Sequence, residues 1–434
     1  MSFAKVAALL LLAGTVAGGA PRAPRRIVLI TIDTLRADAL PGNPRMEALA
    51  QDSAVFTEAW SPAPWTLPAL ASILTGVSPQ VHLATGLNGR VPGRLTTVAE
   101  AARRAGLRTA ALVSSPVLGR GANLAQGFDE YSGEPASPPQ LAGRAVRWLR
   151  AQKKSRGFFL WIHFYDPHSP YEAPPEYLDG LKAPPGLEVR LGTAELLAIR
   201  IRERDPAPAE REWIRRLYAA EVRWVDDAVG TLLAELKRLG MYEGSLIVLT
   251  SDHGEEFWEH GGIGHGHTLY EELLHVPLLV KLPGNTRRGE IDLPVSTASL
   301  AATFLDLAGA PLPARYPAAP SLRPLLQGGA APPPFLATGL QRIEEQEALR
   351  FDRFKYIRRL TSGKDELYDL ARDPGERRDL AASSLSTVDE AKRLLAGLTA
   401  ESARARKALS IQKKEEIPLG SEERKRLRAL GYGR

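Results

Sequence analysis

Three short, continuous apolar blocks lie far apart along the chain. They span residues 26–32 (RIVLITI), 158–162 (FFLWI) and 246–250 (LIVLT). Blocks of this length are typical of parallel strands that are buried on both faces of a sheet. We therefore expect the three blocks to be strands of one parallel sheet core.

Helical patterns lie between these blocks. Apolar residues recur at helical spacing across residues 210–239, and Gly240 follows as a helix stop. Residues 99–105 predict a helix that leads into a strand at 109–113. This alternation of strands and helices predicts an α/β fold.

Acidic and imidazole side chains follow each apolar block. Asp33 follows the first block, His163 the second, and the pair Asp252 and His253 the third. Because open α/β sheets bind ligands beyond the carboxyl ends of their strands, we expect these groups to converge, and a carboxylate and an imidazole can bind one divalent cation. Asp33 and Asp252 could instead only shape turns, with His163 a core imidazole, but three coincidences favour a site. Seven of the eight histidines also cluster from His163 to His275.

The segment of residues 61–76 (SPAPWTLPALASILTG) supplies a candidate nucleophile. Pro68 is typical of the first turn of a helix and Gly76 of the residue just past its end, so Thr66 lies at or just before the helix N-terminus. Free backbone N–H groups and the helix dipole favour an anionic group there by roughly 0.3–1 kcal/mol. The alternative is that Thr66 merely caps the helix, which is a common role for threonine.

Six segments together resemble the sulfatase family within the alkaline-phosphatase superfamily. They occur in order from about residue 26 to residue 382: LITIDTLRADAL (29–40), the helical segment from Thr66 to Gly76, FYDPHSPY (164–171), SDHGE (251–255), LYEELLHVPLLV (269–280) and ELYDLARDPGE (366–376). The resemblance implies a mixed sheet sandwiched by helices, with a small β-rich C-terminal subdomain. It also implies a metal-dependent enzyme that acts on anionic esters.

The resemblance implies a role for individual residues. The implied roles are metal binding by Asp33, Asp252, His253 and the nucleophile Thr66, catalysis by Thr66, His168 and His265, and substrate binding by His163, His260 and His267. This ligand set favours Zn²⁺ or Mn²⁺, with Ca²⁺ as the alternative. Two-metal relatives need an Asp-x-x-x-His pair, and no Asp of this chain has a His four residues later, so we expect a single ion.

The chain departs from the family where its special chemistry resides. Typical sulfatases carry Cys or Ser in a Cys-x-Pro-x-Arg setting, which is oxidised to formylglycine, and an Asp-Asp pair at the first metal strand. In this chain Thr66 stands at the position of the Cys or Ser, Leu70 at that of the Arg and Thr34 at that of the second Asp. The chain has no cysteine. Threonine cannot become formylglycine, whereas a phosphoryl group on threonine can pass to water or an alcohol.

These departures favour a hydrolase or transferase that acts through Thr66 on a phosphate (di)ester or a phosphonate. The ester could belong to a lipid, a glycan or a small molecule. Two alternatives stay open at this point. One is a sulfuric ester hydrolase that uses Thr66 directly, and the other is a non-catalytic member that binds anionic ligands.

Composition excludes some other classes of partner. The formal charge is only +6, and no basic segment is interleaved with aromatic residues, so we expect no nucleic acid partner. Hydrophobic residues make up 44% of the chain, with no long apolar run past the N-terminus. We therefore expect a large buried core and no stable membrane span.

The N-terminus resembles an export signal. Lys5 precedes an apolar stretch at residues 6–16, and small residues at 17–20 suit cleavage. The predicted regions are a signal peptide at 1–20, the catalytic α/β domain at 26–310, a Pro/Ala/Gly-rich linker at 311–334, a β-rich subdomain at 335–385 and a charged helical tail at 386–434. Within the subdomain, residues 348–358 and 366–370 predict a hairpin. We expect a periplasmic or extracellular protein, with an uncleaved anchor as the alternative.

We predict that the mature protein begins near Pro21 and is found outside the cytoplasm. Mass spectrometry of the N-terminal peptide from each cell fraction measures this. The variant Leu11→Arg should keep the full-length chain inside the cell, because a charge interrupts the short apolar region that export requires. Recovery of wild-type protein with an intact Met1 from the cytosol would contradict the prediction.

Overall fold

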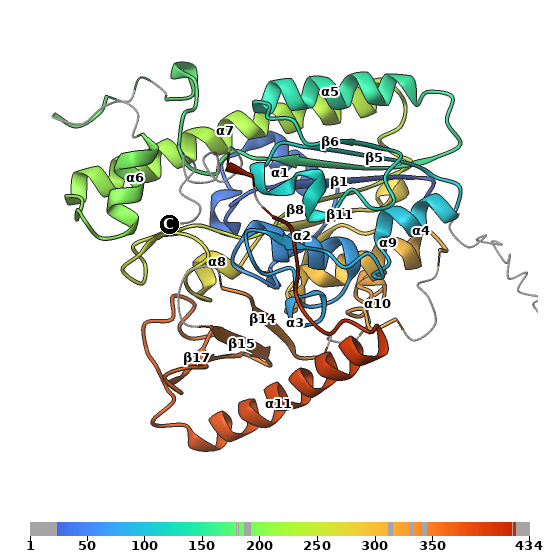
Figure 1. Ribbon diagram of the computed structural model, residues 1–434. Coiled ribbons are helices and arrows are strands. Elements are labelled where there is room, and N and C mark those ends of the chain that lie inside the picture. Colours follow the sequence, from blue (N-terminus) through green and yellow to red (C-terminus); the bar gives the residue numbers. More distant parts are fainter. Residues whose placement is uncertain are drawn as a thin grey trace, which may run out of the picture.

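An eight-stranded mixed sheet forms the centre of the protein, as the computed structural model shows (Figure 1). The structure describes residues 24–178, 180, 182–185, 192–310, 316–329, 333–340, 345–418 and 420–421. In order across the sheet, the strands are β12 (Gly289–Ile291), β2 (Ala54–Phe56), β11 (Leu278–Lys281), β8 (Ser245–Ser251), β1 (Arg26–Ile32), β7 (Phe158–Phe164), β5 (Arg108–Val113) and β6 (Glu130–Ser132). β1 is parallel to β7 and β8, whereas β11 is antiparallel to β8.

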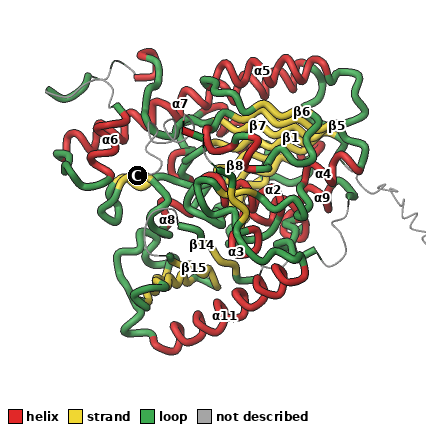
Figure 2. Tube along the Cα trace, in the orientation of Figure 1, coloured by secondary structure: helices red, strands yellow, loops and turns green. Residues whose placement is uncertain are grey.

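Helices cover both faces of this sheet (Figures 1 and 2). One layer contains α1 (Pro44–Gln51), α5 (Pro138–Ala151) and α7 (Pro208–Arg238), and the other contains α2 (Thr66–Thr75), α4 (Val98–Arg104), α9 (Leu300–Leu307) and α10 (Arg323–Leu326). Side chains of a strand point alternately to the two faces. Thus Ile27 and Leu29 of β1 join one core cluster, while Val28 and Ile30 join the other. The predicted helix-sandwiched sheet is confirmed.

The three predicted central strands coincide with β1, β7 and β8. The predicted helices at 99–105 and 210–239 begin and end within two residues of α4 and α7. Gly240 follows α7 with φ of 65°, a conformation that glycine adopts without strain. The local pattern of apolar residues was sufficient here because each of these elements buries apolar side chains in the core.

A four-stranded antiparallel sheet forms the C-terminal subdomain. Its strands are β14 (Phe335–Thr338), β15 (Gln346–Phe351), β16 (Phe354–Arg359) and β17 (Asp365–Asp369). The prediction of one continuous strand across 348–358 is wrong, because the chain turns at Asp352, whose φ is 45°. Aspartate tolerates this left-handed conformation better than most residues, and Arg350 donates a hydrogen bond to the Asp352 carbonyl across the turn.

The long helix α11 (Leu385–Ala408) packs against this subdomain. Val388, Ala391 and Leu395 share a core cluster with Leu349 and Tyr356 of the sheet. This part of the segment that we separated as a charged tail therefore closes the core of the subdomain. Residues 422–434 lie outside the described residues.

Parts of the other predicted regions also lie outside the described residues, namely the signal peptide at 1–20 and residues 311–315 and 330–332 of the linker. The described part of the linker contains α10, which places Leu325 and Leu326 in the main core. Within the described ranges, no helix has both the length and the apolar composition needed to cross a membrane.

Short elements complete the fold. They are β3 (Ala59–Trp60), α3 (Pro79–His82), β4 (Gly89–Arg90), α6 (Thr193–Arg200), β9 (Glu256–Phe257), β10 (Ile263–Gly264), α8 (Glu271–Leu274), β13 (Val295–Ser296), β18 (Glu415–Glu416) and 3₁₀ helices at Ala37–Ala39, Pro116–Leu118, Arg120–Ala122, Pro175–Leu178, Pro283–Asn285 and Thr297–Ser299.

A buried lysine joins the subdomain to the main domain. The ammonium group of Lys355, on β16, lies 3.0 Å from Glu271 Oε1 and 2.9 Å from Glu376 Oε1. It also lies 4.7 Å from the centre of the Trp60 ring. The side chain of Lys355 is fully buried, so both carboxylates depend on it for charge compensation.

We predict that Lys355→Met lowers the free energy of unfolding by about 3–5 kcal/mol, because the buried Glu376 and the partly buried Glu271 lose their cation. Urea denaturation measures this. The matched control is Arg358→Met, on the same strand but exposed, which should change stability by less than about 0.5 kcal/mol. Equal stabilities of the two variants would show that the buried ion pairs do not join the subdomain to the main domain.

Candidate active site

Asp33 lies at the carboxyl end of β1 and is fully buried. Its N–H donates to the Phe164 carbonyl at the end of β7, at 3.0 Å. The next residue, Thr34, has φ of 55°, a strained value for a β-branched residue. Its N–H donates to Asp252 Oδ1 at 3.3 Å, and its carbonyl accepts from the Tyr218 hydroxyl at 2.9 Å. These bonds hold Asp33 at the centre of the sheet edge.

His253 follows β8 and turns its imidazole toward Asp33. A Cβ atom on Gly254 would lie 2.0 Å from the Glu272 carbonyl oxygen, so only glycine fits this close approach. The Gly254 carbonyl accepts a hydrogen bond from His253 Nδ1 at 2.9 Å. The other ring nitrogen, Nε2, lies 3.4 Å from Asp33 Oδ1 and 3.4 Å from Asp252 Oδ2.

Thr66 is the first residue of α2, and its hydroxyl joins this cluster. The N-cap residue is Trp65, so the alternative that Thr66 is only a cap does not describe the structure. Thr66 Oγ1 lies 3.5 Å from Asp33 Oδ2 and 3.4 Å from His253 Nε2. The structure thus brings together all four residues that we expected to bind the metal. They come from three segments that lie far apart in the sequence.

His163 also reaches the cluster. Its Nε2 lies 3.4 Å from Asp33 Oδ2, while its Nδ1 lies 2.8 Å from the Thr31 hydroxyl. One ligand atom each from Asp33, His163 and Asp252 lie within 4.8 Å of one another. Burial lowers the pKa of His163 to about 4, which keeps the imidazole neutral, as metal binding requires. We had placed His163 among the substrate-binding residues, and the geometry adds it to the candidate metal ligands.

The chemistry of this cluster fits a divalent cation. The buried oxygens Asp33 Oδ1 and Asp252 Oδ2 accept no hydrogen bond from any described residue. Burial raises the pKa of Asp33 well above its ordinary value, and the neighbouring Asp252 raises it further. Two buried carboxylates that face imidazole nitrogens are stable as anions when a cation lies between them.

His168 and His265 form a second pair beside the cluster. The His265 ring centre lies 4.5 Å from that of His253 and 4.8 Å from that of His168. His265 Nδ1 lies 2.9 Å from Glu255 Oε2. Burial lowers the pKa of His168 well below its ordinary value, and His265 lowers it further. His168 is therefore a neutral imidazole, whereas His265 is held by the carboxylate of Glu255.

Two residues near this pair were missed by the sequence analysis. Glu255 is fully buried, and Arg200 Nη2 of α6 lies 4.0 Å from its Oε1. Gly264, with φ of 92°, leaves room for Arg200, since a Cβ there would lie 2.5 Å from the guanidinium. Glu255 could have been found as the last residue of the SDHGE motif. Arg200 has no sequence signal, because it lies more than fifty residues before Glu255 in the chain and only folding brings the two together.

His260 and His267 are held by other groups. His260 Nδ1 lies 2.8 Å from Glu272 Oε1, and its ring stacks on Tyr270 with centres 3.7 Å apart. His267 Nε2 lies 2.6 Å from Glu256 Oε2. The described hydrogen bonds join neither ring to the carboxylate cluster. Their substrate-binding role stays a prediction.

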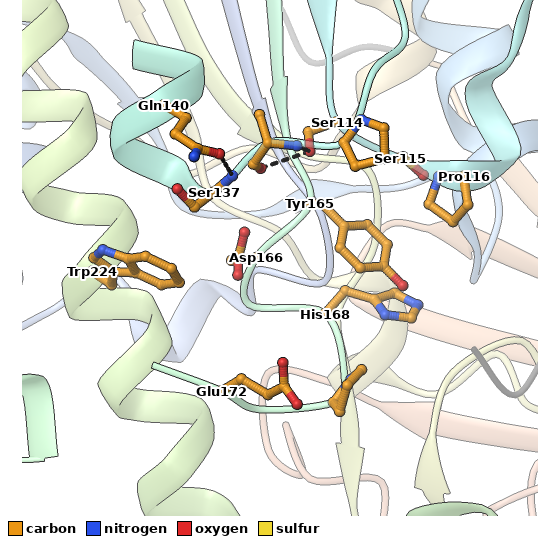
Figure 3. A pocket seen from close by; sticks show the side chains of 13 residues that line it. Ser114, Ser115, Pro116, Ser137, Gln140, Tyr165, Asp166, His168, Glu172 and Trp224 are labelled. Atoms are coloured by element: carbon orange, nitrogen blue, oxygen red, sulfur yellow. Dashed lines mark hydrogen bonds between the residues drawn. The ribbon is translucent and has the colours of Figure 1, made fainter. Parts of the chain in front are cut away.

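An open cavity of about 560 Å³ adjoins the site, and His168 forms part of its wall (Figure 3). Small-molecule sites are typically concave spaces of about 300–1,000 Å³ with a few polar groups. A ligand in this cavity would therefore lie against His168. The site thus combines a carboxylate–imidazole cluster, a hydroxyl at a helix N-terminus and a space of ligand size.

The fold and this site define an ester-hydrolysing enzyme of the α/β class. The chain belongs to the sulfatase family, since residues 25–310 match the family model described as Sulfatase. A second model, N-sulphoglucosamine sulphohydrolase, C-terminal, matches residues 259–401.

One curated relative agrees with this assignment, and two solved structures share the fold. A choline-sulfatase of Rhizobium meliloti is 26% identical over 84% of each chain. A solved complex of a protein with its substrate D-glucosamine-2-N,6-O-disulfate has a TM-score of 0.75, at 20% identity, and covers 88% of this chain and 99% of that chain. A phosphonate monoester hydrolase from Silicibacter pomeroyi has a TM-score of 0.70, at 22% identity, and covers 88% and 95%.

We predict that the purified wild-type protein holds about one divalent ion per chain and that Asp252→Asn holds almost none. Elemental analysis measures the metal content.

Ion binding at a hundred times Kd adds about 2.7 kcal/mol of stability, so a chelator should lower the melting temperature of the wild type. After chelation Asp252→Asn should be at least as stable as the wild type, since it relieves the repulsion with Asp33. The control Asp227→Asn, whose carboxylate is exposed, should behave as the wild type, and equal chelator sensitivity of Asp252→Asn would refute the site.

Proposed function

We propose that this protein cleaves a phosphate (di)ester or a phosphonate ester through a covalent intermediate on Thr66. The observation that carries the proposal is the position of the Thr66 hydroxyl. It lies within 3.5 Å of both Asp33 and His253, at the N-terminus of α2. A hydroxyl held there is placed to attack an ester whose anionic oxygens face the helix N–H groups.

The residue type favours phosphorus over sulfur. Thr66 occupies the position where the resemblance implies formylglycine, and the chain has no cysteine that could be converted. A phosphoryl group on a threonine oxygen can be displaced by water or by an alcohol. Either hydrolysis or transfer to an acceptor alcohol completes the reaction.

Asp33, Asp252, His253 and His163 would hold the cation. When bound, the cation supplies Lewis-acid charge neutralisation at an ester oxygen and lowers the pKa of the Thr66 hydroxyl. The ligand set of two carboxylates with imidazoles suits Zn²⁺ or Mn²⁺, with Ca²⁺ as the alternative.

The second histidine pair faces the same reaction centre. Glu255 lies 2.9 Å from His265 Nδ1 and orients the imidazole, which suits a contact between the ring and the leaving oxygen. Arg200 brings a guanidinium beside Glu255 from α6. Buried Arg200 Nε has no hydrogen-bond partner among the described residues. We assign it to the anionic oxygens of the ester, because a buried guanidinium favours such a partner.

A sulfate ester is the second candidate substrate. The observations that favour it are the match to the sulfatase family model and the neighbour that was solved with a sulfated glucosamine. A direct attack of Thr66 at sulfur would then replace the formylglycine route. A panel of aryl sulfate, phosphate monoester, phosphodiester and phosphonate, each with Zn²⁺, Mn²⁺ and Ca²⁺, separates the two candidates.

We also propose that the enzyme acts outside the cytoplasm. The support is the N-terminal pattern of one lysine, a short apolar region and small residues before Pro21.

We predict that Thr66→Ala lowers kcat for an aryl phosphodiester more than about 10³-fold, because the nucleophile is gone. Thr66→Ser should keep a sizeable fraction of the activity, since it keeps the hydroxyl. Metal content and melting temperature, measured on both variants, separate loss of the nucleophile from loss of the fold. Thr75→Ser, at the other end of the same helix, is the matched control.

A further variant tests the choice of chemistry. Thr66→Cys should gain no strong sulfatase activity, because Leu70 stands where the formylglycine setting has Arg. Near-normal phosphodiester turnover by Thr66→Ala would exclude the covalent mechanism.

A further inference from the structure

The cavity beside His168 has an acidic wall. Asp166 and Glu172 line it, together with the indole ring of Trp224 and the side chains of Pro116 and Pro170. Among the described residues that line the cavity there is no lysine or arginine. The chain as a whole carries a formal charge of +6. The negative character of this cavity is therefore local and opposite to the charge of the molecule.

The carboxyl of Asp166 has no cation beside it. In Figure 3 it lies in the middle of the cavity, with Trp224 on one side and His168 on the other. No described lysine or arginine forms an ion pair with Asp166 or Glu172. Burial raises the pKa of Asp166 to about 7, and the negative charge of Glu172 contributes. Such a carboxyl is held at an energetic cost that a bound cation would relieve.

We propose that this cavity binds an ammonium group carried by the alcohol portion of the ester. The proposal rests on the proposed function, because it takes the ester group to lie at Thr66 and the rest of the substrate to extend past His168. The substrate is then zwitterionic, with its anionic centre at the cation cluster and its positive charge at Asp166 and Glu172.

The acidic and aromatic residues of the cavity wall favour a positively charged group over an anionic or a neutral group of the same size. A second anionic group would be repelled by two carboxylates. A neutral alkyl group would leave the half-buried carboxyl of Asp166 without a partner, whereas Glu172 is exposed to solvent. The Trp224 ring adds a cation–π surface, worth about 0.5–1 kcal/mol where partly exposed. A quaternary or primary ammonium satisfies both the ring and the carboxylates.

A second cavity near the site shows the contrast. It has a volume of about 290 Å³ and an arginine-rich lining that includes Arg204 and Arg211. These two arginines are already paired with Glu210 and Asp205, at 2.6 Å in each case. The charges of these two arginines are therefore compensated within the chain, whereas no described lysine or arginine pairs with Asp166 or Glu172.

The test compares two p-nitrophenyl phosphodiesters that differ in a single atom. Their second ester groups are 2-(trimethylammonio)ethyl and its neutral isostere 3,3-dimethylbutyl. We expect kcat/KM to be at least about tenfold higher for the ammonium ester, as release of nitrophenolate measures. Asp166→Asn should reduce this ratio to about twofold or less, and Glu172→Gln should reduce it in part. The control Glu176→Gln, an exposed carboxylate outside the cavity lining, should leave it unchanged. The same comparison, made with sulfate esters of the two alcohols, tests the proposal for the second candidate reaction.

Equilibrium binding separates this proposal from the proposed function. Calorimetry of both esters with the Thr66→Ala protein, and with Thr66→Ala combined with Asp166→Asn, gives Kd without turnover. If neither ester is cleaved but the ammonium ester binds about tenfold tighter in an Asp166-dependent way, the cavity assignment stands and the reaction is wrong. If both esters are cleaved and bound equally, the reaction stands and the cavity assignment is overturned. Absence of binding by either ester, or a ratio that Asp166→Asn leaves unchanged, also overturns it.

Discussion

The structure depends on one electrostatic constraint, the burial of Asp33 and Asp252 side by side at the ends of β1 and β8. Neither carboxylate has a compensating lysine or arginine among the described residues, and each has an oxygen without a hydrogen-bond donor. Such a pair is costly in a dry environment unless a cation lies between the two groups. The strained turn at Thr34 and the glycine at 254 are the local features that keep both side chains in place.

The candidate metal ligands and the candidate nucleophile come from different kinds of element. The carboxylates follow parallel strands, so the sheet fixes their separation through its hydrogen bonds. Thr66 begins a helix of the layer that covers one face, and α2 carries its hydroxyl to the same point. Because Asp33 and Asp252 each directly follow a strand and Thr66 begins a helix, the backbone positions these side chains with little freedom. The proposed attack by the Thr66 hydroxyl would rely on this precision, since threonine is a weak nucleophile without activation.

Charge divides the surroundings of the site into two parts. On one side, Arg200 and the histidine pair supported by Glu255 suit the anionic centre of an ester. On the other, Asp166, Glu172 and Trp224 line a cavity that suits positive charge. The shared border is His168, which lies in both groups. A substrate with opposite charges at its two ends would satisfy both.

The sequence by itself determined the elements and the groups attached to their ends. The apolar blocks set β1, β7 and β8, and with them Asp33 and Asp252, because burial on both faces leaves a continuous local pattern. It missed the turn at Asp352, since two strands joined by two polar residues look like one. Only the tertiary structure placed His163 among the candidate metal ligands, brought Arg200 to Glu255 and set Asp166 beside Trp224. These contacts join residues from separate elements, and no local periodicity encodes how such elements pack together.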